Sequence, residues 1–120
     1  MRIRSLLALG LSLSGCAAIN QHEPVAGWPE LKVVEHHVST QQMRERCMRF
    51  VGPLSSPEGC TLFDLDQSEA HIFISKDFPN PLVLEHERLH AAGYDHLGSN
   101  HMQRVLARWQ SRQRTQQAAN

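Results

Sequence analysis

The chain of 120 residues lacks several features that mark common protein classes. Lys and Arg together number 12, and so do Asp and Glu, so the formal net charge is zero. It has no basic patch of the kind that binding to nucleic acid requires. The apolar run near the N-terminus, residues 6–13, is too short to span a bilayer as a stable helix. We find no internal repeat and no second domain, so the sequence predicts one small domain with a modest core.

The N-terminus carries a targeting pattern. Arg2 and Arg4 form a basic start, and the apolar run that follows ends in Leu-Ser-Gly-Cys at residues 13–16. A basic start before a short apolar stretch is typical of a secretory signal, which does not belong to the fold. The last four residues resemble the lipobox of bacterial lipoproteins. This resemblance implies cleavage before Cys16 and lipid on that cysteine, whereas the alternative is a buried N-terminal helix with a chance cysteine.

This resemblance divides the chain into a signal peptide at 1–15, a tether at 16–30 and a domain at 31–120. Ala17 stands where inner-membrane lipoproteins of enterobacteria have Asp, so the resemblance favours the outer membrane, facing the periplasm. The mature chain would have 105 residues, with 10 basic and 12 acidic side chains, and we expect a monomer. Its membrane association would come from the lipid rather than from charge.

Only three cysteines are present, and the lipobox accounts for one of them. Cys47 and Cys60 remain, and in an oxidising envelope such a pair usually forms a disulfide. Closing a loop of this size is worth about 3 kcal/mol in the chain-entropy model. The alternative is zinc ligation by the two thiolates, but two further ligands at suitable spacing are not evident. We therefore predict a Cys47–Cys60 disulfide.

The pattern of apolar residues predicts an α+β domain. Asn80 is suited to cap a helix that begins with Pro81. We expect a small antiparallel or mixed sheet of about three strands, one helix that carries the functional motif, and two further helices. The expected elements are a strand at 31–38, a helix at 40–50, a hairpin of strands at 61–66 and 70–75, a helix at 81–92, and a last helix from Asn100 that frays beyond residue 110.

One eleven-residue segment, which begins at His86, reads H-E-x-x-H-x-x-G-x-x-H without a mismatch. On a helix, His86 and His90 project from one face about one turn apart. Gly93 lets the chain leave the helix with a positive φ, and the turned chain can bring His96 round as a third nitrogen ligand. Glu87 follows the first ligand, beside the metal, where it can take a proton from water. Three protein ligands with one open position predict catalytic Zn²⁺.

The length of this motif makes coincidence improbable. His and Glu each occur 8 times in the chain, so a bare H-E-x-x-H would arise in roughly 3 of 100 shuffled sequences. The full motif would arise in about 1 of 10,000. The alternative is an ordinary helix end that carries surface histidines.

The motif resembles that of the metzincin clan of zinc endopeptidases. The resemblance implies a minimal zincin-like domain that hydrolyses peptide bonds in a peptide or protein substrate. It also implies an edge strand just upstream, here residues 70–75, along which an extended substrate binds. The site residues that it implies are His86, His90 and His96 as zinc ligands and Glu87 as the general base.

The other polar residues are open to two interpretations each. His36 and His37 lie together on a predicted strand, and we expect a solvated pair. His71 either lines the substrate edge or is a surface strand residue, and His101 is expected to be exposed at a helix start. Asp95 either orients a ligand imidazole or is a surface carboxylate.

Three functional hypotheses follow for the sequence. The first is a lipid-anchored zinc metallopeptidase of the cell envelope, in which Glu87 serves as the base. The second is a non-catalytic metal-binding lipoprotein, and the third is an envelope module that binds a partner peptide at the sheet edge. The presence of Glu87 favours the enzyme, because a purely structural metal site has no use for a base there.

Overall fold

The structure is a computed structural model that describes residues 21–51 and 58–120, so Cys16 and the signal peptide lie outside the described residues. Within these ranges the chain forms two small sheets and three helices, which confirms the predicted α+β class. The elements are β1 (His22–Pro24), β2 (Lys32–Val38), α2 (Thr40–Val51), β3 (Gly59–Asp64), β4 (Glu69–Ser75), α3 (Pro81–Ala91), β5 (Tyr94–His96) and α4 (His101–Ala119).

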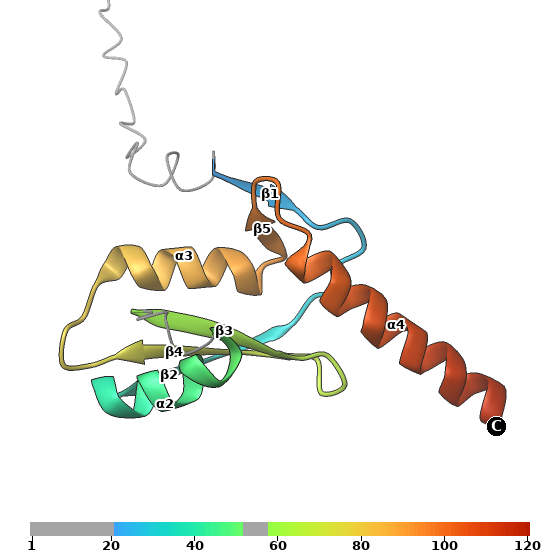
Figure 1. The fold of residues 1–120 in the computed structure, drawn as a ribbon, viewed down its shortest axis with the longest axis horizontal. Coiled ribbons are helices and arrows are strands. Elements are labelled where there is room, and N and C mark those ends of the chain that lie inside the picture. The colour runs from blue at the N-terminus through green and yellow to red at the C-terminus, as the bar shows by residue number, and fades with distance from the viewer. Residues whose placement is uncertain (1–20, 52–57) are drawn as a thin grey trace, which may run out of the picture.

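The main sheet has the strand order β2-β4-β3, with β2 parallel and β3 antiparallel to β4. Helix α3 covers one face and α2 the other (Figure 1). Alternate residues of β4 lie on the two faces of the sheet, because successive side chains along a strand point to opposite sides. Ala70, Ile72 and Ile74 pack toward Ala91 of α3, whereas Phe73 packs toward α2. The predicted hairpin of β3 and β4 is confirmed.

The predicted position of the edge strand is wrong. Residues 70–75 form most of β4, which is hydrogen-bonded to a strand on each side and is the central strand of the sheet. The sequence did not show this, because β2 reaches β4 only through the long crossover that includes α2. Among the described strands of this sheet, β2 and β3 form the edges.

The predicted disulfide between Cys47 and Cys60 is confirmed, with a Cα–Cα distance of 5.7 Å. It joins α2 to β3. Both cysteines are buried, together with Met43 and Phe73, in the core on the α2 side of the sheet. The bond therefore ties helix α2 to the sheet.

The described part of the predicted tether, residues 21–30, is part of the fold. His22–Pro24 forms β1, which pairs antiparallel with β5. Val25 is buried in a cluster with Met102 and Leu106 of α4. The ring of Trp28 contacts that of Phe63 at a centroid distance of 4.7 Å. So short a strand has no periodicity to detect, and its partner lies about 70 residues further along the chain.

Helix α4 differs from expectation at both ends. Asn100 is the N-cap residue, but its side chain makes no capping hydrogen bond. The carboxylate of Asp95 takes that role and accepts a hydrogen bond from the backbone N–H of Met102 at 3.0 Å. The helix continues to Ala119 rather than fraying from residue 110, and Trp109 donates a hydrogen bond to Asp66 at 3.1 Å. Across residues 21–51 and 58–120, we find no helix with the length and apolar character needed to cross a membrane.

Candidate metal centre

Helix α3 begins and ends where the sequence predicts. The backbone N–H of Leu82 donates to the side chain of Asn80 at 3.1 Å, and Pro81 occupies the first turn. Gly93 follows the helix with φ +98°, a conformation that side-chain-bearing residues rarely adopt. The chain then turns into β5, at the end of which lies His96.

The three histidines of the motif converge. Nε2 of His86 lies 3.1 Å from Nε2 of His90 and 3.2 Å from Nε2 of His96. In a tetrahedral site with Zn–N bonds of about 2.05 Å, neighbouring nitrogens are about 3.3 Å apart. The spacing of these nitrogens therefore fits a common metal ion.

A backbone contact sets the orientation of His90. Its Nδ1 lies 2.8 Å from the carbonyl oxygen of Tyr94, so Nδ1 carries the ring proton and donates a hydrogen bond to that oxygen. Nε2, the nitrogen that faces His86, is then the one with a free lone pair. Metal-bound histidines in proteins are usually held by such a hydrogen bond on the other ring nitrogen.

A fourth histidine, His22, completes the group. It is directly opposite His96 in the β1–β5 pair, and it is buried, with 7 % of its surface exposed. One ligand atom from each of His22, His86, His90 and His96 lies within 4.8 Å of the others, an arrangement that could hold a metal ion. The sequence did not reveal His22, because no spacing rule connects it with a motif 64 residues away.

Burial favours the neutral form of two of the motif histidines. The pKa of His86 is lowered mainly by burial and secondly by the neighbouring His90. The pKa of His90 is also lowered by burial, against the opposing effect of its hydrogen bond to Tyr94. Imidazole binds metal only when it is deprotonated, so both shifts favour the form that binds.

Glu87 follows His86 on α3 and lines the same hollow, with 8 % of its surface exposed. Its Oε2 accepts a hydrogen bond of 2.7 Å from the hydroxyl of Thr61 on β3. Burial raises the pKa of the Glu87 carboxyl, and the Thr61 hydrogen bond opposes this in part. A buried carboxylate with a raised pKa, next to a cluster of imidazoles, has the character of a proton-transfer group.

The interpretation of Asp95 as a surface carboxylate is wrong, and two hydrogen bonds that it accepts come from backbone N–H groups rather than from a ligand imidazole. It is buried, with 3 % of its surface exposed, so it is not a surface carboxylate. Its oxygens accept hydrogen bonds from the backbone N–H groups of His96 and Met102, at 2.8 and 3.0 Å. The imidazole Nδ1 of His96 is 3.9 Å from the carboxylate, too far for a hydrogen bond. Burial raises the pKa of Asp95, but these backbone hydrogen bonds lower it below its usual value overall.

The other histidines lie apart from this centre. His36 and His71 are 2.8 Å apart through their ring nitrogens, and His36 stacks on Phe73, on the α2 side of the sheet. His71 therefore does not line a substrate edge beside α3, and His36 is half-buried rather than solvated. His37 and His101 are exposed, as expected.

Two features of this centre require glycine at position 93: the positive φ of its backbone and the close packing of Trp28 against it. A Cβ at Gly93 would lie 2.6 Å from Cδ1 of Trp28, whereas a Cβ at Gly98, with φ +77°, would meet nothing within 4 Å. We expect Gly98→Ala to lower the free energy of unfolding by about 1 kcal/mol, the cost of the backbone conformation alone. Gly93→Ala should lower the free energy of unfolding by about 3 kcal/mol, because overpacking against Trp28 adds to the cost of the backbone conformation. Urea unfolding of the two variants measures this difference, and equal losses would contradict the packing role of Trp28.

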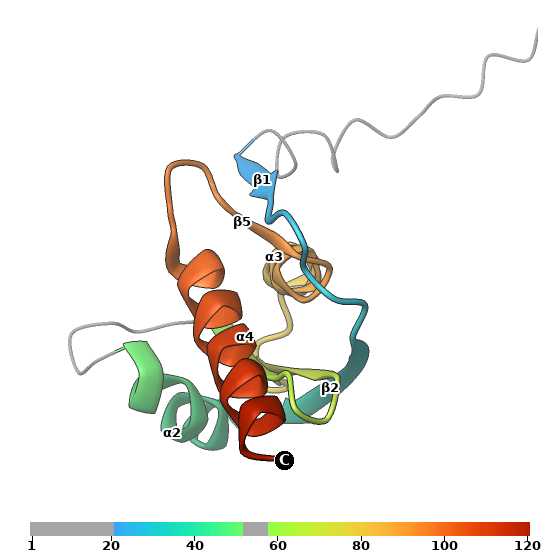
Figure 2. The same ribbon diagram turned by 90° about the vertical axis from the view of Figure 1, so that its right-hand side faces the viewer.

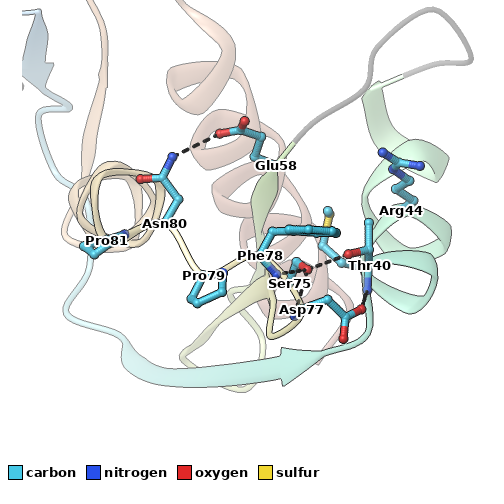
Figure 3. Close-up of a pocket in the computed structure, with 10 residues that line it drawn as sticks. Thr40, Arg44, Glu58, Ser75, Asp77, Phe78, Pro79, Asn80 and Pro81 are labelled. Carbon is cyan, nitrogen blue, oxygen red and sulfur yellow. Dashed lines mark hydrogen bonds between the residues drawn. The ribbon is translucent and has the colours of Figure 1, made fainter.

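Two adjoining hollows lie along the start of α3. The larger, of about 700 Å³, lies against Thr40 and Arg44 of α2 and is lined by Phe78, but by none of the four histidines (Figure 3). The more open one, of about 420 Å³, is lined by Gly59 of β3 and by His86 and Glu87. Glu58 and Asn80, which are joined by a hydrogen bond of 3.5 Å (Figure 3), line both hollows.

Comparison of the chain with protein-family models, with curated proteins and with solved structures gave no match.

Proposed function

We propose that this chain is a lipid-anchored zinc metallopeptidase of the bacterial cell envelope. The observation that carries the proposal is the convergence of three motif imidazoles beside a buried carboxylate, that of Glu87. Such a group of ligands, with a base next to it, is typical of sites that activate water for hydrolysis. Imidazole ligands suit Zn²⁺ as well as copper, iron and nickel, and the combination with a glutamate base favours zinc.

A zinc ion held by His86, His90 and His96 would supply Lewis acidity, which would polarise a substrate carbonyl and lower the pKa of the attacking water. The protein supplies proton transfer. Glu87 takes the proton of that water and passes it to the leaving amine. Thr61 holds one carboxylate oxygen in place, and burial raises the pKa of Glu87 above its usual value, which makes the carboxylate a stronger base.

The more open of the two hollows offers a place for an extended substrate. Its lining brings Gly59, at the start of β3, together with His86 and Glu87. Among the described strands, β3 pairs only with β4, so a peptide backbone is proposed to pair with its other edge. A peptide that pairs with this edge would pass beside the metal ligands. Substrate binding is therefore proposed at β3 rather than at residues 70–75.

The proposed location rests on the lipobox resemblance at residues 13–16 and on the disulfide. A disulfide is expected in an oxidising compartment, which agrees with export. We expect the mature chain to begin at a lipid-modified Cys16. Mass spectrometry of the protein purified from membranes measures this, and an intact Met1 with an unmodified Cys16 would exclude the lipid anchor.

Metal analysis and a cleavage assay test the activity. The purified full-length chain should contain about one zinc ion and cleave members of a peptide library. A chelator should remove both the metal and the cleavage, and added zinc should restore them. A zinc-loaded chain that cleaves no peptide would contradict the peptidase function.

One observation favours a second function, that of a non-catalytic zinc-binding lipoprotein. His22 brings the number of nitrogen donors to four, and a closed set of four protein ligands is typical of structural zinc. The cleavage assay separates the two functions, because this alternative predicts bound zinc without hydrolysis.

A further inference from the structure

We propose that His22 is a fourth metal ligand and that strand β1 closes the coordination position which hydrolysis requires. The inference rests on the proposed metal site but not on peptide hydrolysis. The motif supplies three donors, and three donors leave one tetrahedral position open. In the structure, a ligand atom of His22 lies within 4.8 Å of a ligand atom of each motif histidine.

The four rings are arranged as a nearly regular tetrahedron. The centroid of His22 lies 4.8 Å from that of His86, 5.4 Å from that of His90 and 5.1 Å from that of His96. The three motif rings are 4.6 to 5.0 Å from one another. Four imidazoles around one tetrahedral zinc ion have centroids about 5 Å apart. The six centroid distances are thus similar to one another, as expected for four imidazoles around one ion.

The register of β1 against β5 accounts for the position of His22. His22 and His96 are directly opposite in an antiparallel pair, so their side chains lie on the same face of the two strands. Glu23, the next residue, points to the other face and is exposed. A shift of the pairing by one residue would turn His22 away from the metal centre.

Strand β1 is held to β5 by backbone pairing, and Glu23 also accepts a hydrogen bond of 3.3 Å from the backbone N–H of Gly98, just beyond β5. The strand has three residues, and β5 is its only strand partner within residues 21–51 and 58–120. Flanking hydrogen bonds join Val25 N–H to the carbonyl of Gly93 at 2.8 Å, and Leu97 N–H to the carbonyl of Gln21 at 3.0 Å. Figures 1 and 2 both show β1 beside β5, above the end of α3 and outside the main sheet. Displacement of β1 would therefore open the metal centre and leave the sheet and its covering helices in place.

The metal centre would therefore have two states, one closed by docked β1 and one open after β1 is released. With β1 docked, four imidazoles surround the metal, and no position remains for water or for a substrate carbonyl. With β1 released, two contacts that do not involve β1 still hold β5 to the helices: His90 Nδ1 donates to the carbonyl of Tyr94, and Asp95 accepts from the backbone N–H of Met102. Any hydrolysis by this site then requires that His22 leaves the metal.

Coordination can be tested without measuring cleavage. The full-length chain is loaded with Co²⁺ in place of zinc, because the visible absorption of Co²⁺ reports its coordination geometry. Free imidazole is then titrated into the wild-type chain, the His22→Ala variant and the Glu23→Gln variant, which alters β1 on its other face. A competition titration with a chelator measures the zinc affinity of each chain.

We expect imidazole to change the spectrum of His22→Ala and bring it to that of the wild type, because it fills the vacated position. The wild-type and Glu23→Gln chains should not respond, and zinc affinity should fall about tenfold or more only in His22→Ala. Should His22→Ala not fold, the wild-type titration decides, since resistance to imidazole supports a closed site and binding overturns it. An unchanged spectrum and affinity in a folded His22→Ala would also overturn the proposal. A lack of peptide cleavage by zinc-loaded His22→Ala, in which the position is open, would count against the proposed function alone.

Discussion

Glu87→Gln is expected to abolish peptide hydrolysis while the chain retains about one zinc ion. The substitution removes the base and leaves all three motif ligands in place. The amide oxygen of Gln can still accept the hydrogen bond from the Thr61 hydroxyl, so the side chain keeps its position. Loss of a general base lowers rates by about 10²- to 10⁴-fold. The measurements are the initial rate of cleavage and the zinc content of the purified variant.

A matched control is available on the same helix. Glu85→Gln makes the same chemical change two residues earlier, at a half-buried position with no role in the proposed site. It should leave both the rate and the zinc content close to those of the wild type. If Glu87→Gln loses its metal, Glu87 is a ligand or a fold residue instead. If it keeps both metal and rate, another group is the base.

His96→Ala is expected to lower zinc affinity by about 100-fold or more, since a directly coordinating nitrogen is lost. The side chain of His96 is 55 % exposed, so its removal opens no cavity in the core. The backbone N–H that binds Asp95 is retained in the variant, and with it the capping of α4. Competition titration against a chromophoric chelator measures the change, and thermal unfolding of the metal-free chains shows whether the fold is intact.

The control for this variant is His101→Ala. His101 is exposed at the start of α4 and lies outside the cluster of four histidines. Its loss should leave zinc affinity unchanged. Equal affinity in His96→Ala and the wild type would mean that His96 is not a ligand. The three remaining histidines, His22, His86 and His90, would then hold the metal.

Local chemistry allowed most of the secondary structure to be predicted. Asn80 and Pro81 mark the start of α3, and Gly93 marks its end, because capping, proline and positive φ are properties of single residues. The hairpin of β3 and β4 follows from alternating apolar residues on both sides of a short polar turn. His86 and His90 converge because of the helical repeat alone. His96 joins them because the chain reverses direction at Gly93.

The arrangement of these elements was not predictable in the same way. Strand β4 is central because β2 joins its far side in parallel, a pairing between residues more than 30 positions apart. Asp95 caps α4 because the path of β5 brings its carboxylate to the backbone of Met102, whereas the nearer Asn100 makes no such bond. Both outcomes depend on long-range packing, to which periodicity and capping rules do not apply.

By itself, then, the sequence determined the α+β class, the disulfide between Cys47 and Cys60, the limits of α3 and the three convergent imidazoles. Each of these depends on residue type or on short spacing along one element. Only the tertiary structure decided that His22 joins the centre. Its approach requires β1 to pair with β5 in one register, and the hydrogen bonds and burial that select this register involve residues from opposite ends of the domain.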